Sequence, residues 1–120
     1  TLDVYNDGKM RRDFTYVDDI VSGVLSCLSS PPKGDNDRVP YAVYNLGNSR
    51  SEELMDVISI IERELGQKAK INFKPIQPGD VTETYADITD ATADFGFNPR
   101  INIADGLPKF IRWYREFYTA

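Results

Sequence analysis

The sequence of 120 residues contains no histidine and a single cysteine, Cys27. Histidine is the commonest general base near neutral pH and the commonest metal ligand, so its absence excludes Ser-His-Asp triads and histidine-bound metal centres. One cysteine excludes an internal disulfide and a cysteine-rich zinc site. Cys27 lies in an apolar run, which predicts a buried, unreactive thiol, and the composition is compatible with a reducing location such as the cytoplasm.

Positive charge and long apolar runs are also scarce. The formal net charge is −5, from 14 Lys and Arg against 19 Asp and Glu. This balance argues against nucleic-acid binding, which draws on clustered basic residues, but it allows a small anionic ligand held by one or two arginines. No apolar stretch approaches the roughly 20 residues of a membrane span, and no signal peptide is visible.

Glycine-rich nucleotide-binding loops are missing as well. The eight glycines lie far apart, so neither a G-x-G-x-x-G turn nor a Walker loop is present. Tyr5 and Lys9 have a Tyr-x-x-x-Lys spacing, but the turn-forming residues between them make a chance match the better interpretation. Pairs of carboxylates occur at positions 18 and 19, 52 and 53, and 87 and 90. Each pair falls at a predicted helix start or turn, where capping explains it better than acid–base catalysis.

The residues that are present predict one α/β domain over residues 1–120. With 41% hydrophobic and 28% charged residues, the composition is that of an ordinary globular protein. Alternating apolar residues predict strands over 2–6, 9–14, 41–47 and 69–76. Apolar residues spaced three and four apart predict helices over 17–28, 49–65, 89–94 and 102–118. Short strands mixed with helices indicate a small α/β or α+β layer.

Local signals predict how these elements are joined and capped. The Asp7-Gly8 pair favours a hairpin between the first two strands. Ser49 with Glu52 has the spacing of a capping box for the second helix, and Ser51 is a competing cap. Further signals are a type II turn over 77–80, a helix stop at Gly66, and Pro108 in the first turn of the last helix.

Two adjacent arginines, Arg11 and Arg12, form the candidate ligand site. Neighbouring side chains on a strand point to opposite faces, so only one of the two can face a site. A guanidinium can pair at two points with a phosphate or carboxylate, which makes Arg12 a candidate for an anionic ligand. A surface ion pair between Arg11 and Asp13, contributing little to stability, is the open alternative.

Five blocks of the sequence, in order, resemble a known family: GKMRRDFTYVDDIVSGV, YNLGNS, QPGDVTETYAD, FGFNP and GL-x-x-F-x-x-WYREFY. They are similar to the carboxy-terminal part of NAD-dependent nucleotide-sugar epimerases and dehydratases of the extended short-chain dehydrogenase superfamily, most of all to the UDP-glucuronate 4-epimerase type. The resemblance implies a small mixed α/β substrate-binding domain that lacks the Rossmann domain. NAD and the catalytic residues would belong to that missing domain, so the chain alone would be inactive.

The resemblance also implies particular substrate-binding residues. Arg12, the arginine of the RDF motif, is expected to contact the diphosphate of a UDP-sugar. Gln77 and Asp80 would complete the site, because many relatives carry Arg-Pro-Gly-Asp there, with Arg on a phosphate and Asp on the ribose. Gln77 departs from that pattern, so phosphate binding would depend more on Arg12. Asn45 and Tyr85 also lie in matching blocks, but the resemblance supports a ligand role for them less than for Arg12, Gln77 and Asp80.

Other functions stay open at this point. Dehydratases and decarboxylases share the same blocks, and a stand-alone binding module without catalysis is a further possibility. If the chain is a fragment, the faces that would pack on the Rossmann domain are exposed. We therefore expect the chain to self-associate. Exchange of a structural element between two copies is one way in which this association can occur. No partner among nucleic acids, metals or membranes is expected.

Overall fold

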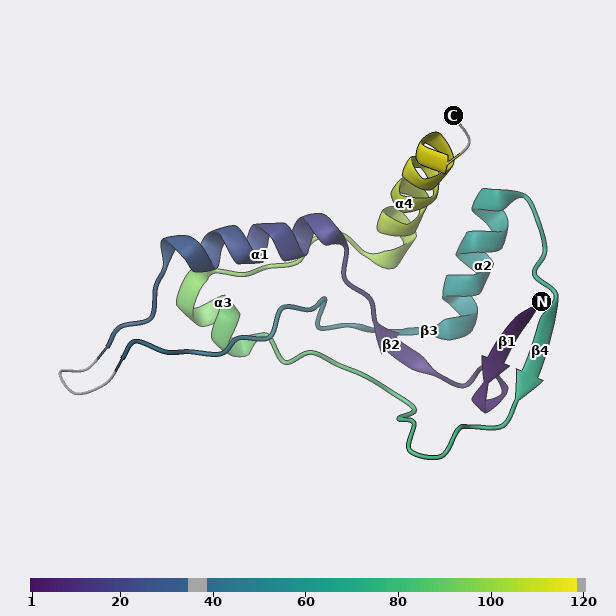
Figure 1. Cartoon of the computed structure of the whole chain (residues 1–120), viewed down its shortest axis with the longest axis horizontal. Helices are drawn as coiled ribbons and strands as arrows, with labels where there is room; N and C mark the ends of the chain where they lie inside the picture. The colour runs from purple at the N-terminus through teal and green to yellow at the C-terminus, as the bar shows by residue number, and fades with distance from the viewer. Residues whose placement is uncertain (35–38, 119–120) are drawn as a thin grey trace.

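A computed structural model describes residues 1–34 and 39–118 of the chain (Figure 1). Short strands and helices are mixed along the whole length, which confirms the predicted α/β class. In chain order the elements are β1 (Leu2–Tyr5), a 3₁₀ turn (Asn6–Gly8), β2 (Arg11–Asp13), α1 (Val17–Ser29), β3 (Ser51–Glu53), α2 (Leu54–Leu65), β4 (Ile71–Lys74), α3 (Thr89–Phe95) and α4 (Ile103–Tyr118).

The strands form two separate pairs, and the predicted hairpin between the first two strands is wrong. β1 lies parallel to β4, while β2 lies antiparallel to β3. The Asp7-Gly8 step does take positive φ, at 50° and 79°, but Asn6 before it is also at 53°. Three successive left-handed residues turn the chain so that β2 leaves the edge of β1, and β4 occupies that edge instead.

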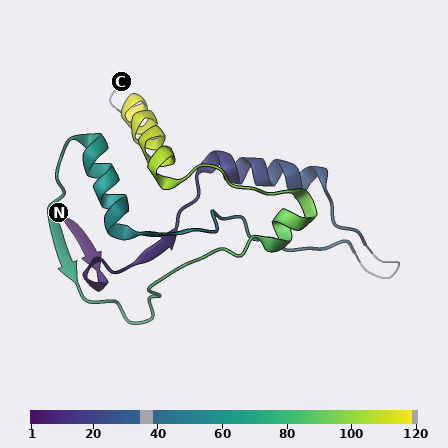
Figure 2. The ribbon, with the colours of Figure 1, turned by 180° about the vertical axis from the view of Figure 1, so that it is seen from behind.

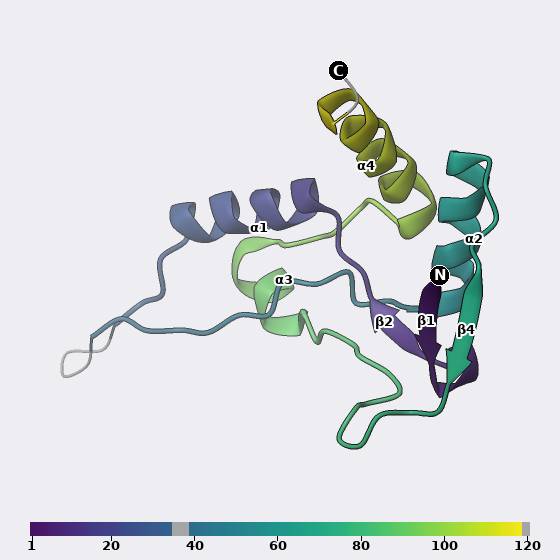
Figure 3. The ribbon, with the colours of Figure 1, turned by 45° about the vertical axis from the view of Figure 1, so that its right-hand side comes forward.

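α2 carries much of the small core and packs beside α4 (Figure 3). The buried apolar residues are Val4, Met10, Val57, Ile58, Ile60, Ala91, Phe97 and Ile111. α2 begins at Leu54 rather than near Ser49, because residues 51–53 pair with β2 as a strand. The predicted capping box is therefore wrong, whereas Gly66 ends the helix in the left-handed conformation, at φ 65°, as predicted.

α1 forms where the sequence predicts it, but its apolar stripe is largely uncovered. Val24 is 47% exposed and Leu28 is 75% exposed. Cys27 is half-buried, so the expectation of a fully buried thiol is wrong. The segment 41–47 runs past this part of the fold without forming a strand, contrary to its alternating pattern. In the described ranges the segment 41–47 pairs with no other strand, and alternation alone does not make a strand without such pairing.

α4 begins earlier than its proline signal indicated. The Asn102 Oδ1 atom accepts a hydrogen bond from the Asp105 N–H at 3.0 Å, which caps the start of the helix. Pro108 is then inside the helix rather than in its first turn. The asparagine bond lies at the start of the helix, which buries Gly106 and Ile111.

The chain is elongated rather than spherical (Figures 1 and 2). Its radius of gyration is 18.2 Å, with extents of 59 × 40 × 20 Å. A compact domain of this length would have a radius of gyration of about 14 Å. Large apolar side chains are exposed along α1 and along α4, including Trp113 and Phe117. Among the described residues, no helix has the length and apolar character needed to cross a membrane.

Candidate functional site

The structure brings together two of the three predicted ligand residues. The Arg12 Nη2 atom lies 3.2 Å from Asp80 Oδ1, although the two residues are 68 positions apart. Arg12 Nη1 donates to the main-chain oxygen of Arg11 at 2.8 Å. The side chains of Arg12 and Asp80 are 27% and 34% exposed, so the pair is half-buried and still reachable from solvent.

The predicted turn at residues 77–80 holds the partner of Arg12. The Asp80 N–H donates to the Gln77 main-chain oxygen at 3.1 Å, and Gly79 takes the positive φ of 83° that a type II turn requires. Asp80 Oδ1 also accepts from the Val81 N–H at 2.9 Å, which fixes the carboxylate in place. The Gln77 side chain is exposed at the start of this turn.

Arg11 points to the other face of β2, as strand alternation predicts. Its Nη1 atom pairs with Glu53 at 2.9 Å, its Nε atom pairs with Glu83 at 3.2 Å, and Nη2 donates to the Ser51 main-chain oxygen. The expected ion pair between Arg11 and Asp13 is therefore wrong. Arg11 instead ties β2 to β3 and to the segment after the 77–80 turn.

Asp13 has a role that the sequence reasoning missed. Its Oδ1 atom accepts from the Asn48 N–H at 2.9 Å, and its Oδ2 atom accepts from the N–H groups of Ser49 and Ala86, each at 3.0 Å. Nothing in the local spacing indicates this, because both segments that donate these N–H groups are more than 30 residues away along the chain. A carboxylate at the end of a three-residue charged strand was the only available signal.

Asp19, in the first turn of α1, acts similarly. It is buried, and its two oxygens accept from the N–H groups of Arg100 and Ile101 at 3.1 and 2.9 Å. Its place in the first turn of α1 predicted a favourable interaction with the helix dipole, which its position still permits. The structure adds a tertiary tether that joins α1 to the segment entering α4.

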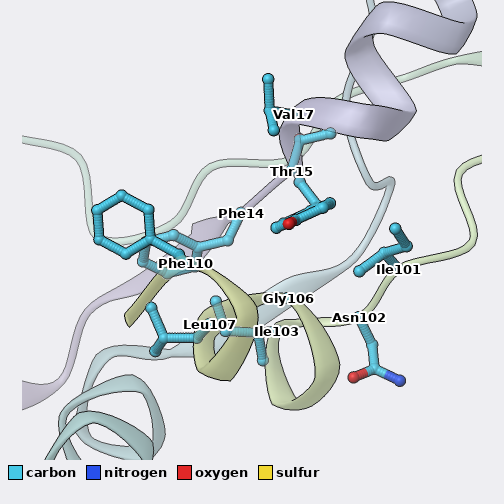
Figure 4. A pocket seen from close by; sticks show the side chains of 10 residues that line it. Phe14, Thr15, Val17, Ile101, Asn102, Ile103, Gly106, Leu107 and Phe110 are labelled. Atoms are coloured by element: carbon cyan, nitrogen blue, oxygen red, sulfur yellow. The ribbon is translucent and has the colours of Figure 1, made fainter. Parts of the chain in front are cut away.

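A small apolar pocket of 270 Å³ lies where β2 leads into α1 and α4 begins (Figure 4). Phe14 and Phe110 line it from opposite elements, and Gly106 lies against the Tyr16 ring. A more polar hollow of 460 Å³ lies on the Asp13 side of β2, next to Asn45 and Tyr85. The apolar walls of the 270 Å³ pocket suit a packed hydrocarbon group, and they offer no counter-charge to a phosphate.

The shifted pKa values report local pairs rather than an acid–base centre. A hydrogen bond from the Tyr44 hydroxyl to Asp94, at 2.6 Å, raises the pKa of Tyr44 to about 12. A tyrosine that acts as a base needs the opposite shift, towards neutral pH. Hydrogen bonds from the Thr89 hydroxyl and N–H lower the pKa of Asp87, which lies two residues before Thr89, the first residue of α3.

The described residues do not fit a dinucleotide or a metal. A pyrophosphate is held by a glycine-rich turn between a strand and a helix. In the described ranges β1 leads into a 3₁₀ turn instead, where Gly8 is packed against Met55. The same part of the chain contains no group of three or more metal-ligating side chains.

Comparison with known proteins gives consistent matches. Residues 2–110 match the family model described as GDP-mannose 4,6 dehydratase. The CapI protein of Staphylococcus aureus is 43% identical over 98% of this chain, and UDP-glucuronate 4-epimerase 5 of Arabidopsis thaliana is 40% identical over 94%. The Bacillus cereus UDP-glucuronic acid 4-epimerase in complex with UDP-glucuronic acid and NAD superposes over 98% of this chain, with a TM-score of 0.79 and 30% identity.

The chain matches only part of the length of each of these relatives. The chain spans 38% of CapI, 28% of the Arabidopsis enzyme and 36% of the Bacillus cereus structure. MoeE5, solved with UDP-glucuronic acid and NAD, gives a TM-score of 0.81 at 29% identity over 37% of its own length. The chain belongs to the GDP-mannose 4,6-dehydratase family, within the NAD-dependent nucleotide-sugar epimerases and dehydratases, and corresponds to the carboxy-terminal part of those enzymes.

Proposed function

We propose that residues 1–120 are the substrate-binding domain of an NAD-dependent UDP-sugar 4-epimerase, with UDP-glucuronate as the sugar nucleotide. The observation that carries this proposal is the contact between Arg12 and Asp80. It joins the RDF block to the QPGD block across 68 residues. These are the two blocks in which the family resemblance places diphosphate and ribose recognition, and they meet at a half-buried surface.

Arg12 and Asp80 have complementary chemistry for a nucleoside diphosphate. A guanidinium carries five N–H donors, and among the described residues two of its nitrogens are engaged, one by Asp80 and one by the Arg11 oxygen. The remaining donors can take a phosphate at two points. The Asp80 carboxylate accepts hydrogen bonds only, which suits the hydroxyl groups of a ribose. Gln77, at the exposed start of the turn, supplies an uncharged amide where many relatives supply a second cation.

The redox chemistry of the proposed enzyme lies outside this chain. The Bacillus cereus enzyme and MoeE5 bind NAD, and the chain matches about a third of each. NAD would supply oxidation of the sugar and return of the hydride, and a Rossmann domain would supply its binding site. The elongated shape and the uncovered apolar faces of α1 and α4 support a domain that packs against another. A cytoplasmic location is part of the proposal and is testable by cell fractionation.

The description of the matching family model favours a second candidate, a nucleotide-sugar 4,6-dehydratase. The shape argues against a third possibility, a stand-alone binding module, because so small a core leaves many large apolar side chains exposed to water. Product analysis separates the first two candidates. An epimerase returns an isomer of the same mass, whereas a dehydratase releases water, and a decarboxylase releases carbon dioxide.

The first test is the Arg12→Ala change in the complete polypeptide that the gene encodes, with UDP-glucuronate as substrate. We expect the KM to rise roughly 10- to 100-fold, because a hydrogen bond to a charged group contributes about 1.5–3 kcal/mol. Arg12→Lys should fall in between, since it keeps the charge and loses the planar fork. Arg63→Ala, an exposed arginine on α2, is the matched control and should behave as wild type.

Three results would count against the proposal. The first is a wild-type polypeptide that converts no UDP-sugar and binds none by calorimetry. The second is an unchanged KM in Arg12→Ala, which would remove Arg12 from the site. The third is a product with the mass of a dehydrated or decarboxylated sugar, which would replace the epimerase by the corresponding alternative.

A further inference from the structure

The geometry points to Asp13 as a positioning residue that holds Asp80 and Tyr85 in register with Arg12. This inference rests on the proposed function, because it concerns the same site. Asp13 itself faces away from Arg12 on β2, so it has no direct contact with a diphosphate bound there. It acts on the site through the backbone of the segment that carries Asp80.

The bonds of Asp13 join three parts of the chain that are distant in sequence. Its carboxylate accepts three main-chain N–H groups, from Asn48, Ser49 and Ala86. Its own N–H donates to the Thr84 hydroxyl at 3.1 Å. Hydrogen bonds to a carboxylate are roughly twice as strong as neutral ones, so one side chain sets the separation of β2 and both segments.

The packing around this carboxylate leaves little freedom. A Cβ atom at Gly47 would lie 2.3 Å from the Ala86 Cβ and 3.1 Å from Asp13 Oδ2, so only glycine fits at that position. Ser49 adopts φ 53°, an unfavourable conformation for a residue other than glycine, and its N–H is one of the groups that Asp13 holds. The carboxylate offsets this local strain.

The segment after the 77–80 turn transmits this effect to the site. Arg11 bonds to it at two main-chain positions: its N–H donates to the Thr82 oxygen, and its oxygen accepts from the Thr84 N–H. Asp13 fixes the far end of the same segment at Ala86. Asp80 lies just before the paired stretch, so a slip or a separation of this segment changes the distance from Arg12 to Asp80.

Tyr85 lies within the same segment, between Thr84 and Ala86. Its hydroxyl accepts a hydrogen bond from Ser49 Oγ at 2.9 Å. The Ser49 N–H itself donates to Asp13, and Tyr85 directly precedes Ala86, whose N–H also donates to Asp13. The position of the Tyr85 ring therefore depends on Asp13 as well. The ring is 64% exposed and is presented to solvent beside the polar hollow.

Asp13→Asn is the informative variant, because it preserves the size of the side chain. An amide has one acceptor oxygen, and its NH₂ group must face one of the three N–H donors. In the complete polypeptide we expect the KM for UDP-glucuronate to rise at least 10-fold with a smaller change in kcat. Asp18→Asn is the matched control, because Asp18 is an exposed carboxylate at the start of α1, and it should match wild type.

A double-mutant cycle separates positioning from a general loss of stability. Because Asp13 positions Asp80 as well as Tyr85, Asp13→Asn should raise the KM by a clearly smaller factor in an Asp80→Ala background than in the wild type, since one of the two positioned groups is already gone. If Asp13→Asn causes a purely structural defect, its effect on the KM should multiply with the effect of Asp80→Ala. Multiplying effects, or an unchanged KM in the single variant, would overturn the inference.

Hydrogen exchange keeps the inference testable whatever the substrate is. Asp13→Asn should speed amide exchange in residues 47–49 and 80–86 and leave α2 unchanged. Thr84→Ala removes only the acceptor of the Asp13 N–H and serves if Asp13→Asn does not fold; it should speed exchange in 80–86 by a smaller factor. Unchanged exchange in both segments would refute the positioning role. If the wild-type polypeptide has no activity on UDP-sugars but the variant shows faster exchange, the proposed function is refuted and the positioning role of Asp13 is not.

Discussion

At the scale of single residues, four aspartates close to one another in sequence or space have different tasks. Asp13 and Asp19 accept main-chain N–H groups from distant segments, whereas Asp18 is exposed at a helix start. Asp80 pairs with Arg12. The residue type predicts only that each must find donors or water. Which donors it finds depends on where the rest of the chain lies, so Asp13 and Asp19 could not be assigned from spacing.

The bond between Tyr44 and Asp94 gives a prediction at this scale. The pKa of Tyr44 is raised from its ordinary 10.0 to about 12. A group whose folded-state pKa is raised stabilises the fold fully below its ordinary pKa, and loses that contribution as pH rises through the folded value. Titration of tyrosinate absorbance should show one tyrosine ionising near pH 12, and that transition should be absent in Tyr44→Phe. A difference titration centred near pH 10 would contradict the bond.

At the scale of elements, pairing between distant strands determined the partner of β1 and the structure of residues 51–53, which the local sequence pattern did not predict. β1 is followed by a turn sequence that favours a hairpin, yet its partner is β4, paired from Leu2↔Ile71 onwards. Residues 51–53 read as the first turn of a helix but form β3, because β2 offers them a free edge. Helices need only hydrogen bonds four residues apart, so α1 and the end of α2 at Gly66 followed the sequence.

Gly23 gives a prediction for the packing of α1. A Cβ atom there would lie 2.9 Å from the Phe97 ring and 3.0 Å from Leu46 Cδ1. Overpacking by Gly23→Ala should cost about 1–3 kcal/mol of the free energy of unfolding. Alanine returns roughly 1 kcal/mol through helix propensity, so the expected net loss is at most about 2 kcal/mol.

Denaturant unfolding of the chain measures this change. Ser22→Ala, at the exposed neighbouring position, is the control and should stay within about 0.5 kcal/mol of wild type. If Gly23→Ala is instead more stable than wild type, the contact between α1 and Phe97 is looser than the structure has it.

At the scale of the whole molecule, the chain has two uncovered apolar faces and a small core. Exposed aromatic residues follow one another along α4, where Trp113 and Phe117 stack at 5.6 Å between ring centres. α1 exposes Val21, Leu25 and Leu28. Apolar patches of this kind mark surfaces that pack on another domain or chain. The elongated shape has the same cause, because few elements of this chain pack on one another.

We therefore predict that the chain, prepared alone, self-associates through these faces. Sedimentation or light scattering should give a mass above that of the monomer, falling on dilution. Trp113→Ser with Phe117→Ser should shift the equilibrium towards monomer, since about 25 cal/mol is lost per Å² of apolar surface no longer buried. Lys109→Ala, a polar change on the same helix, is the control. A strictly monomeric wild-type chain would contradict this prediction.

The sequence by itself determined the α/β class, the main helices, the type II turn at 77–80 and the placement of Arg11 and Arg12 on opposite faces of β2. These follow from periods of two and 3.6 residues and from turn chemistry, which act between near neighbours. Only the tertiary structure decided the partners of β1 and β2, the contact of Arg12 with Asp80, and the three bonds of Asp13. Those choices join residues tens of positions apart, and backbone pairing and close packing, rather than local preference, select among them.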